Sequence, residues 1–349
     1  MLSWNDYLNM QRITRTHSRT TTASRRARRL AQRTTLAACA IVALTAPGVA
    51  SGADTLISDG PEANEVAALD GTVVWVSGND DDETRNTNQT LMQHSGGVTK
   101  RVKDAPRANY RSIDLGHDRR GKLVLTYRRC GQTKCMPIQD NLKGRRSSFK
   151  KLTLKRCELT TAPAMWGARI AYGLLCRKPN NVTDPKRTRV YVKTGAGTPR
   201  RLRSPTNDFA RRITSVDLRR NRAAAVAEGV ADFAFRQKVD ATELRSLQVG
   251  LAQGDSGSFA KGVSLGTGSA MWALSSTEPV GKPVGATIFN VLGDCYRSEV
   301  LPTPFSDPDK QRIVPALDIA VDGTTVYLAV SGVGIVKHEF VPQGDCTKL

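Results

Sequence analysis

A strand–turn–strand unit recurs along this chain about every 50 residues, and it limits the possible folds more than any other feature. In the first unit, Val66 to Ser77, the pair Asp70-Gly71 is typical of a tight turn before a β-branched and aromatic strand. The other units are Ile113 to Cys130, Pro163 to Cys176, Val216 to Gly229, Val263 to Ser276 and Leu317 to Ser331. The pattern predicts an all-β chain built of repeats.

The spacing of the turns indicates which repeat this is. The turn positions are Gly71, Gly121, Gly167, Asn221, Gly268 and Gly323, and the steps between them are 50, 46, 54, 47 and 55 residues. Propeller blades of four strands repeat every ~40 to 50 residues, and a closed ring leaves few strand edges exposed. We therefore expect a single six-bladed β-propeller over residues 64–349, with seven blades as the alternative.

The first 53 residues are expected to lie outside this fold. An arginine-rich segment with a single acidic residue precedes an apolar run of 11 residues, Leu36 to Ala46, which a Pro-Gly pair ends. This order is typical of a secretory signal peptide, and the run is shorter than the ~20 residues of a membrane-spanning helix. We expect cleavage after Ala53, with Ala50 as the alternative, then a linker over residues 54–63 and no transmembrane anchor.

Two other export signals match parts of this segment less well. Leu36 to Cys39 has the form of a lipoprotein signal, but the apolar core of a lipoprotein signal precedes the cysteine, and here it follows. Ser24 to Arg26 resembles a twin-arginine signal, but Ala27 and Arg28 lack the usual apolar position. Both stay alternatives to the ordinary secretory signal.

Six cysteines remain after the expected cleavage, and an even number in an exported chain favours disulfides. They are Cys130, Cys135, Cys157, Cys176, Cys295 and Cys346. The spacing favours pairs between neighbours in the chain, and one or two reduced pairs are the alternative. A metal site is not expected, because Cys-x4-Cys has no second close pair and histidine is scarce. No cofactor is expected either.

Three segments of the repeats resemble a known family. IDLGHDRRGKLVLTYRRC, MWGARIAYGLLC and RVYVKTGAGTPRRL are similar to exported TolB-like or WD40-like propeller proteins of high-GC Gram-positive bacteria. The shared features are the hydrophobic, Asp-x-Gly and aromatic positions, over most of residues 64–349. The fourth and fifth units depart from the pattern with strands rich in Ala or Ser. The resemblance implies a binding surface, and no catalytic motif comes with it.

Two motifs suggest hydrolytic chemistry. GDSGS, from Gly254 to Ser258, resembles the nucleophile loop of trypsin-like serine proteases, but that chemistry needs a histidine base. No histidine lies in the Ala-Ala-His-Cys setting of that family, so we expect a loop between blades. His117-Asp118 has the composition of an acid/base pair, but its place between two strands favours an exposed turn.

Other polar and aromatic positions favour structural roles. We expect His94 and His338 to be isolated surface or strand residues, and Asp80 to Glu83 to be a solvated loop, because its spacing lacks the alternation of a Ca²⁺ loop. Trp75, Trp166 and Trp272 are interpreted as equivalent core positions and not as platforms for sugars.

Basic residues are the broadest chemical feature. Removing residues 1–53 lowers the net charge from +20 only to +13. The clusters, most of them between residues 100 and 222, are Lys100 to Lys103, Arg119-Arg120, Arg128-Arg129, Lys143 to Arg146, Lys150-Lys151, Lys155-Arg156, Lys186-Arg187, Arg200 to Arg203 and Arg211-Arg212. If they share a face, they attract a polyanion such as a wall polymer, lipid head groups or extracellular nucleic acid. An aromatic content of 5% argues against specific nucleic-acid binding. The alternative is charge spread over the surface without function.

These observations favour an exported, disulfide-containing, monomeric and non-catalytic binding or scaffold propeller. Its partner is an unknown protein or an anionic polymer. The alternative is a propeller hydrolase or lyase with its site in the central channel. Such an enzyme needs several inward-facing His, Asp, Glu or Arg residues in one funnel, and a convergent cluster containing His117 or His338 would favour it over the binding module.

Overall fold

The computed structural model divides into two compact units, Met1–Val49 and Ala50–Leu349, and the second holds all the described residues. The structure describes residues 54–58, 63–78, 88–204, 212–229, 231–241, 243–253, 256–278, 285–301, 306–307, 312–313 and 316–349. The segment expected to be a signal peptide and the acidic loop Asp80 to Glu83 lie outside these ranges. Within them, no helix is long and apolar enough to cross a membrane. Apart from one 3-10 helix, η1 (Thr267–Ser269), their regular structure is β-strand.

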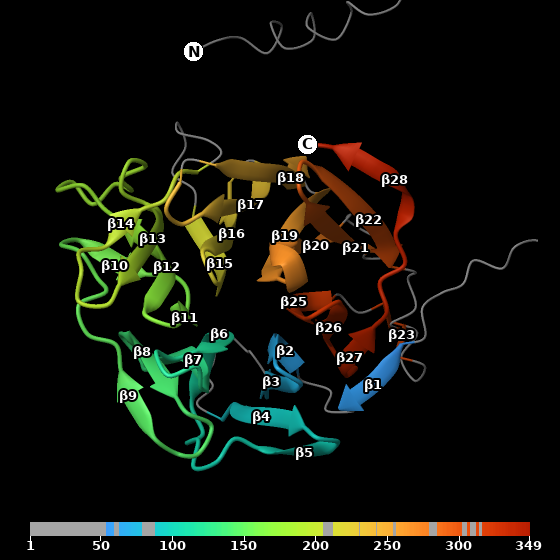
Figure 1. Cartoon of the computed structure of the whole chain (residues 1–349), viewed down its shortest axis with the longest axis horizontal. Coiled ribbons are helices and arrows are strands. Elements are labelled where there is room, and N and C mark those ends of the chain that lie inside the picture. The colour runs from blue at the N-terminus through green and yellow to red at the C-terminus, as the bar shows by residue number, and fades with distance from the viewer. Residues whose placement is uncertain are drawn as a thin grey trace, which may run out of the picture. The chain divides into compact units, whose positions relative to one another are not determined.

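Most strands pair in antiparallel fashion with the next strand in the sequence, so the chain forms successive runs, mostly of four strands (Figure 1). The first run contains β2 (Ala63–Leu69), β3 (Thr72–Ser77), β4 (Thr90–Ser95) and β5 (Val98–Arg101). The second contains β6 (Asn109–His117), β7 (Leu123–Cys130), β8 (Cys135–Asp140) and β9 (Arg146–Ser148). The third contains β10 (Cys157–Leu159), β11 (Ala164–Trp166), β12 (Arg169–Cys176), β13 (Arg189–Thr194) and β14 (Arg200–Arg201).

Three more runs follow in the described residues. The fourth contains β15 (Arg212–Arg219), β16 (Arg222–Glu228), β17 (Ala231–Lys238) and β18 (Leu244–Gln253). The fifth contains β19 (Ser256–Leu265), β20 (Met271–Glu278), β21 (Gly285–Leu292) and β22 (Cys295–Leu301). The sixth contains β25 (Ala316–Asp322), β26 (Thr325–Val330) and β27 (Gly334–His338), while β23 (Ser306–Asp307) and β24 (Arg312–Ile313) pair with each other.

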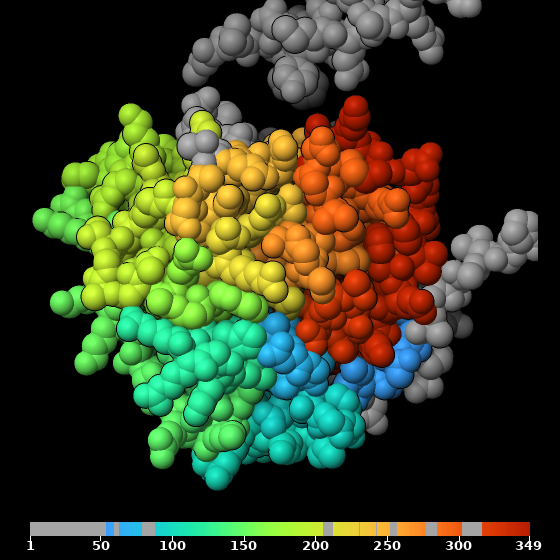
Figure 2. All heavy atoms as spheres, in the orientation of Figure 1, coloured from blue at the N-terminus to red at the C-terminus, as the bar shows by residue number. Residues whose placement is uncertain are grey.

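The two ends of the second unit complete the outer strands. β1 (Thr55–Ser58) pairs with β27, so the sheet formed by the sixth run contains strands from both ends of the unit (Figure 1). In the space-filling view, blue atoms of β1 adjoin the red atoms of the last run (Figure 2). β28 (Gln343–Lys348) adds a fifth strand to the fifth run. Sheets arranged in this way around a common centre form a β-propeller, which confirms the predicted fold class. β1 places a strand in the segment predicted as a linker.

The middle strands of the runs are buried on both faces. In β3, TVVWVS, every residue but the last is buried, because a neighbouring run covers each side of the sheet. Such strands read as continuous apolar segments instead of alternating ones. The turn before β3 has positive φ at both Asp70 (52°) and Gly71 (70°), which matches a two-residue hairpin. The Ala-rich segment after Asn221 forms the strands β16 and β17.

Between neighbouring runs of the described residues lie separate apolar clusters with side chains from both runs, except between the second and third runs. The cluster between the fifth and sixth runs contains 13 buried side chains, among them Leu274 and Leu328. The cluster on the side of the third run that faces the second contains five, from β12, β13 and the segment between β9 and β10, and none from β6 to β9; its members are Leu152, Tyr172, Leu174, Cys176 and Tyr191. The second–third interface is therefore the poorest in buried apolar side chains.

The tryptophans do not all occupy equivalent positions. Trp75 in β3 and Trp272 in β20 lie on second strands and are 1% and 6% exposed. Trp166 instead ends the first-strand segment β11 and packs edge-on against His117 at 4.7 Å between ring centroids. The predicted equivalence of Trp166 is wrong, because this tryptophan precedes its turn glycine whereas the other two follow theirs.

Candidate functional site

Five of the first strands of the runs carry a β-bulge, near the beginning of four of them and in the middle of β19. The register shifts lie between Ala63 and Glu65, Arg111 and Ile113, Ile213 and Ser215, Ala260 and Gly262, and Ala316 and Asp318. A bulge leaves one extra residue unpaired and bends the strand. The five extra residues are Asn64, Ser112, Thr214, Lys261 and Leu317, and all of them line one cavity of about 180 Å³. The bulges therefore shape a polar cavity where the first strands converge.

The first strands are joined to one another mainly through side-chain oxygens. Their backbones pair directly only between β11 and β6 in the described residues, in a single parallel pair. Elsewhere Glu65 of β2 accepts hydrogen bonds from the Ser112 and Ile113 amides of β6, at 2.8 and 3.0 Å. Asp318 of β25 accepts one from the Val66 amide of β2, at 3.0 Å. These carboxylates satisfy backbone donors that have no strand partner.

The same device joins the fourth, fifth and sixth runs. Asp217 of β15 accepts a hydrogen bond from the Leu265 amide of β19 at 2.5 Å. Ser264 of β19 in turn accepts one from the Val321 amide of β25 at 3.1 Å. Arg219 donates to the Val321 and Ala68 carbonyl oxygens, at 2.7 and 3.3 Å. Polar side chains at the centre thus connect neighbouring runs.

Burial changes the protonation of the central carboxyls. Desolvation raises the pKa of Glu65 and raises that of Asp318 to about 8. Burial also raises the pKa of Asp114 well above its usual range, and the neighbouring Asp217 carboxylate adds to this effect. The pKa of Asp217 is raised by burial too, although Arg219 opposes the rise. These shifts all favour the protonated forms, so the centre carries less negative charge than its carboxyl count suggests.

These acids were not singled out from the sequence, although a signal was present. IDL, VDL and LDI recur in the second, fourth and sixth repeat units, each placing one Asp within an apolar first strand. A carboxylate in such a setting needs hydrogen-bond donors. The donors come from other runs, so the pattern marks the acids without identifying their partners.

Of the described histidines, His117 ends the first strand β6, whereas His94 and His338 lie on the third strands of their runs. His94 is within hydrogen-bond distance of Thr99, at 2.9 Å, and His117 lies 2.6 Å from an Asp70 oxygen. His338 is a strand residue, as expected, but it is not isolated. It is 4% exposed, and its two ring nitrogens lie 2.7 Å from Asp54 Oδ1 and 3.0 Å from Glu299 Oε2. None of the three histidines lines a cavity of the centre.

The other predicted motifs take structural positions. Gly254 and Asp255 of GDSGS lie outside the described residues, and Gly257 and Ser258 pair with the end of β18 across the connection between two runs. Asp118 accepts hydrogen bonds from the Arg120 and Lys122 amides in its turn. That carboxylate caps a loop.

The six cysteines form the three neighbouring pairs that the spacing favoured. Cys130–Cys135 closes the hairpin between β7 and β8, and Cys157–Cys176 links β10 to β12. Cys295–Cys346 ties β28 to β22. In the described residues no group of three or more His, Cys, Asp or Glu side chains is arranged to hold a metal ion.

Positive charge is concentrated on one part of the ring. Residues 98–204, from β5 to β14, contain 28 Lys and Arg but six Asp and Glu, a net charge of +22. Residues 54–97 and 205–349 together contain 16 Lys and Arg and 25 Asp and Glu, a net charge of −9. We call residues 98–204 the basic region. The two parts have the same strand architecture, so the fold does not impose this difference.

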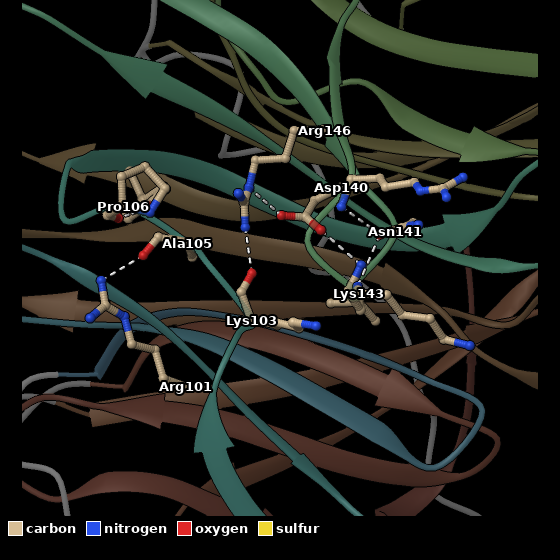
Figure 3. A network of polar contacts seen from close by, with 11 residues as sticks. Arg101, Lys103, Ala105, Pro106, Asp140, Asn141, Lys143 and Arg146 are labelled. Carbon is tan, nitrogen blue, oxygen red and sulfur yellow. Dashed lines mark hydrogen bonds and ion pairs between the residues drawn. The ribbon is translucent and has the colours of Figure 1, made fainter.

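Some cations of the basic region support the fold. Arg146 pairs with the buried Asp140 at 2.6 Å and donates to the Lys103 carbonyl oxygen, whereas Arg101 donates to the Ala105 carbonyl oxygen, both at 2.5 Å (Figure 3). Others are exposed. They include Lys103, Arg119, Arg120, Lys122, Lys134, Lys150, Lys151 and Lys155. These exposed cations are available to an anionic partner.

Comparisons with known proteins add no function. No family model and no curated protein match the chain. Among solved structures, a mutant of AofleA from Arthrobotrys oligospora shares 11% identity at a TM-score of 0.47, covering 86% of this chain and 90% of its own. The WD40 repeats of RRP9 share 6% at 0.46, covering 84% and 99%. YCF48 bound to D1 peptide shares 9% at 0.38, covering 84% and 97%. Function must be argued from this chain's own residues.

Proposed function

We propose that this protein is an exported, six-bladed, non-catalytic propeller that binds an anionic partner through the basic region. In this proposal, residues 1–53 are a signal peptide and the mature chain is a monomer. Three disulfides support an oxidising compartment outside the cytoplasm, where such bonds persist. The partner is then a polyanion or an acidic protein of the envelope or its surroundings.

The observation that carries this proposal is the uneven charge. A net charge of +22 over residues 98–204, against −9 over the rest of the mature chain, creates a field that attracts anions to one part of the ring. Exposed lysines and arginines without a role in the fold are costly to collect in one place, because like charges repel. A binding function accounts for their concentration.

Two matched charge reversals test this proposal. The first replaces Lys103, Arg119, Lys134 and Lys151 with Glu, and the second replaces Arg245, Arg297, Lys337 and Lys348. All eight residues are exposed, and both variants lose the same net charge. We expect affinity for linear polyphosphate, measured across a salt series, to fall at least about tenfold further in the first variant. An equal loss in both would mean that net charge alone drives binding.

A channel hydrolase or lyase is the second candidate, and Asp114 is the observation that favours it. Asp114 Oδ2 is buried and makes no hydrogen bond to the described residues, and its pKa is raised by burial. A protonated carboxyl of this kind can act as a general acid. An enzyme is disfavoured because backbone amides already donate hydrogen bonds to the oxygens of Glu65 and Asp318. Hydrolysis of p-nitrophenyl esters or glycosides that Asp114→Asn abolishes, in a chain that still folds, would favour the enzyme.

A further inference from the structure

The interface between the second and third runs contains a groove of about 750 Å³. One wall comes from the hairpin between β7 and β8, and the other from the segment between β9 and β10. Strand alternation explains why apolar packing is sparse there. β7 presents Leu125 and Tyr127 to the cluster shared with the first run, which leaves Val124, Thr126 and Arg128 for the opposite face. The third run therefore meets a partly polar surface.

Covalent and polar links hold the groove open in place of an apolar core. Cys135 and Cys157 both line it, and each belongs to a disulfide that braces one wall. Across the groove, Arg128 Nη1 donates to the Leu159 carbonyl oxygen at 2.6 Å. Such links hold the site in its binding shape before a ligand arrives, so less conformational entropy is lost on binding.

The charges that line the groove favour an anion. Arg128, Lys134, Lys151 and Arg212 line it, and Glu158 is the single acidic residue among the described residues of its lining. Lys134, Lys151 and Arg212 are exposed. The groove also approaches the central cavity, because Thr160 and Arg212 line the groove while Thr161 and Thr214 line the cavity. An extended ligand can thus run from the outer hairpin toward the centre.

The lining also limits the chemistry of that ligand. Among the described residues of the lining, Phe149 is the one aromatic side chain, whereas binding of single-stranded nucleic acid depends on several aromatic stacking platforms. Among the same residues, Met136 is the one large apolar side chain that is exposed, and a single such side chain is too little for insertion into a bilayer. The groove suits a hydrophilic chain with repeated anionic oxygens and no rings that stack.

We propose that this groove binds a stretch of a linear, hydrophilic polyanion carrying repeated phosphate or carboxylate groups. The inference rests on the proposed function, and it places the binding site in the basic region together with Arg212 of β15. Lys134, Lys151 and Arg212 contact successive anionic groups, and Arg128 keeps the two walls in register.

Two triple variants within the wild-type chain test the groove. Lys134→Glu, Lys151→Glu and Arg212→Glu change the groove, whereas Arg119→Glu, Arg120→Glu and Lys122→Glu change the turn at the opposite end of β7. The probes are linear polyphosphate, polyglutamate and oligothymidylate of matched charge, measured by fluorescence anisotropy across a salt series. We expect the groove variant to lower the slope of log affinity against log salt by about two, since each lost contact removes ~0.7 to 0.9. The control variant should lower this slope by less than the ~0.7 to 0.9 expected for the loss of one contact.

Each outcome separates the groove from the wider proposal. Equal losses in the two variants, with unchanged melting temperatures, would overturn the groove and leave binding to the basic region standing. Absence of polyanion binding by the wild-type chain would overturn both. Tighter binding of oligothymidylate than of polyphosphate would overturn the polymer class, because it would show that bases contribute. The stronger of polyphosphate and polyglutamate identifies the anionic group.

Discussion

The interface between the second and third runs differs sharply from the interface between the fifth and sixth runs. The fifth–sixth interface has a cluster of 13 buried apolar side chains from both runs, whereas the cluster beside the second–third interface has five, none of them from the second run. The second–third interface instead has a disulfide within each wall, an arginine that bridges the runs, and a groove lined by cations. The same repeat can therefore serve stability at one place in the ring and leave room for a ligand at another.

The largest expected effect compares one leucine from each interface. Leu328 is 0% exposed in the fifth–sixth cluster, and Leu152, on the segment that connects the second and third runs, is 4% exposed in the smaller cluster against β12 and β13. We expect Leu328→Ala to lower the free energy of unfolding by about 4 to 5 kcal/mol and Leu152→Ala by about 2 to 3 kcal/mol, because a sparse site can relax around the cavity. Chemical denaturation measures both values. Equal losses would show that the two interfaces are packed alike.

The next effect concerns the disulfides. Removing Cys157–Cys176, whose cysteines are 19 residues apart, should cost about 3 kcal/mol, and removing Cys295–Cys346, 51 residues apart, about 4 kcal/mol. Paired Cys→Ser variants measured by thermal unfolding test these values. Loss of Cys157–Cys176 should also weaken polyphosphate binding, whereas loss of Cys295–Cys346 should not. If both variants bind like the wild type, the disulfide is not needed to hold the groove in shape.

The smallest expected effect is a pH dependence in the fifth–sixth interface. His338 of β27 bridges Glu299 of β22 and Asp54, just before β1. Burial alone lowers the pKa of His338, but hydrogen bonds and the charges of Glu299 and Asp54 together raise it above its ordinary value. A raised folded-state pKa contributes stability that is full below the unfolded value of ~6.5 and is lost as the pH rises through the folded value.

Unfolding measured between pH 6 and pH 9 tests this prediction. We expect the wild-type chain to lose stability across that range and His338→Gln to lose less, because glutamine does not titrate. Gln139→His, on a partly buried strand position of the second run, controls for adding a histidine elsewhere. Parallel pH profiles of stability for the wild type and His338→Gln would show that His338 does not cause the pH dependence.

Local patterns predicted much of the fold. The turn glycines and the apolar segments after them marked the first and second strands of the runs, and Asp70-Gly71 adopts the two-residue turn expected of it. The pairs of cysteines close in the chain are also close in space. The predicted equivalence of Trp166 with the other two tryptophans was wrong because the sequence is apolar and aromatic on both sides of the turn at Gly167.

The candidate site was less predictable, because its residues come from distant parts of the chain. Glu65 meets Ser112 across 47 positions, and Asp318 meets Val66 across 252. His338 looked isolated in the sequence, yet its partner Asp54 lies 284 positions away. Short motifs carry no information about such partners.

The amino-acid sequence by itself determined the all-β repeats, the positions of their turns and the excess of positive charge, since these depend on neighbours along the chain. The tertiary structure alone decided which carboxylates face the centre, which cations support the fold and where a groove replaces an apolar core. Those properties depend on desolvation and on donors supplied by other runs, and they exist only once the ring has brought distant strands together.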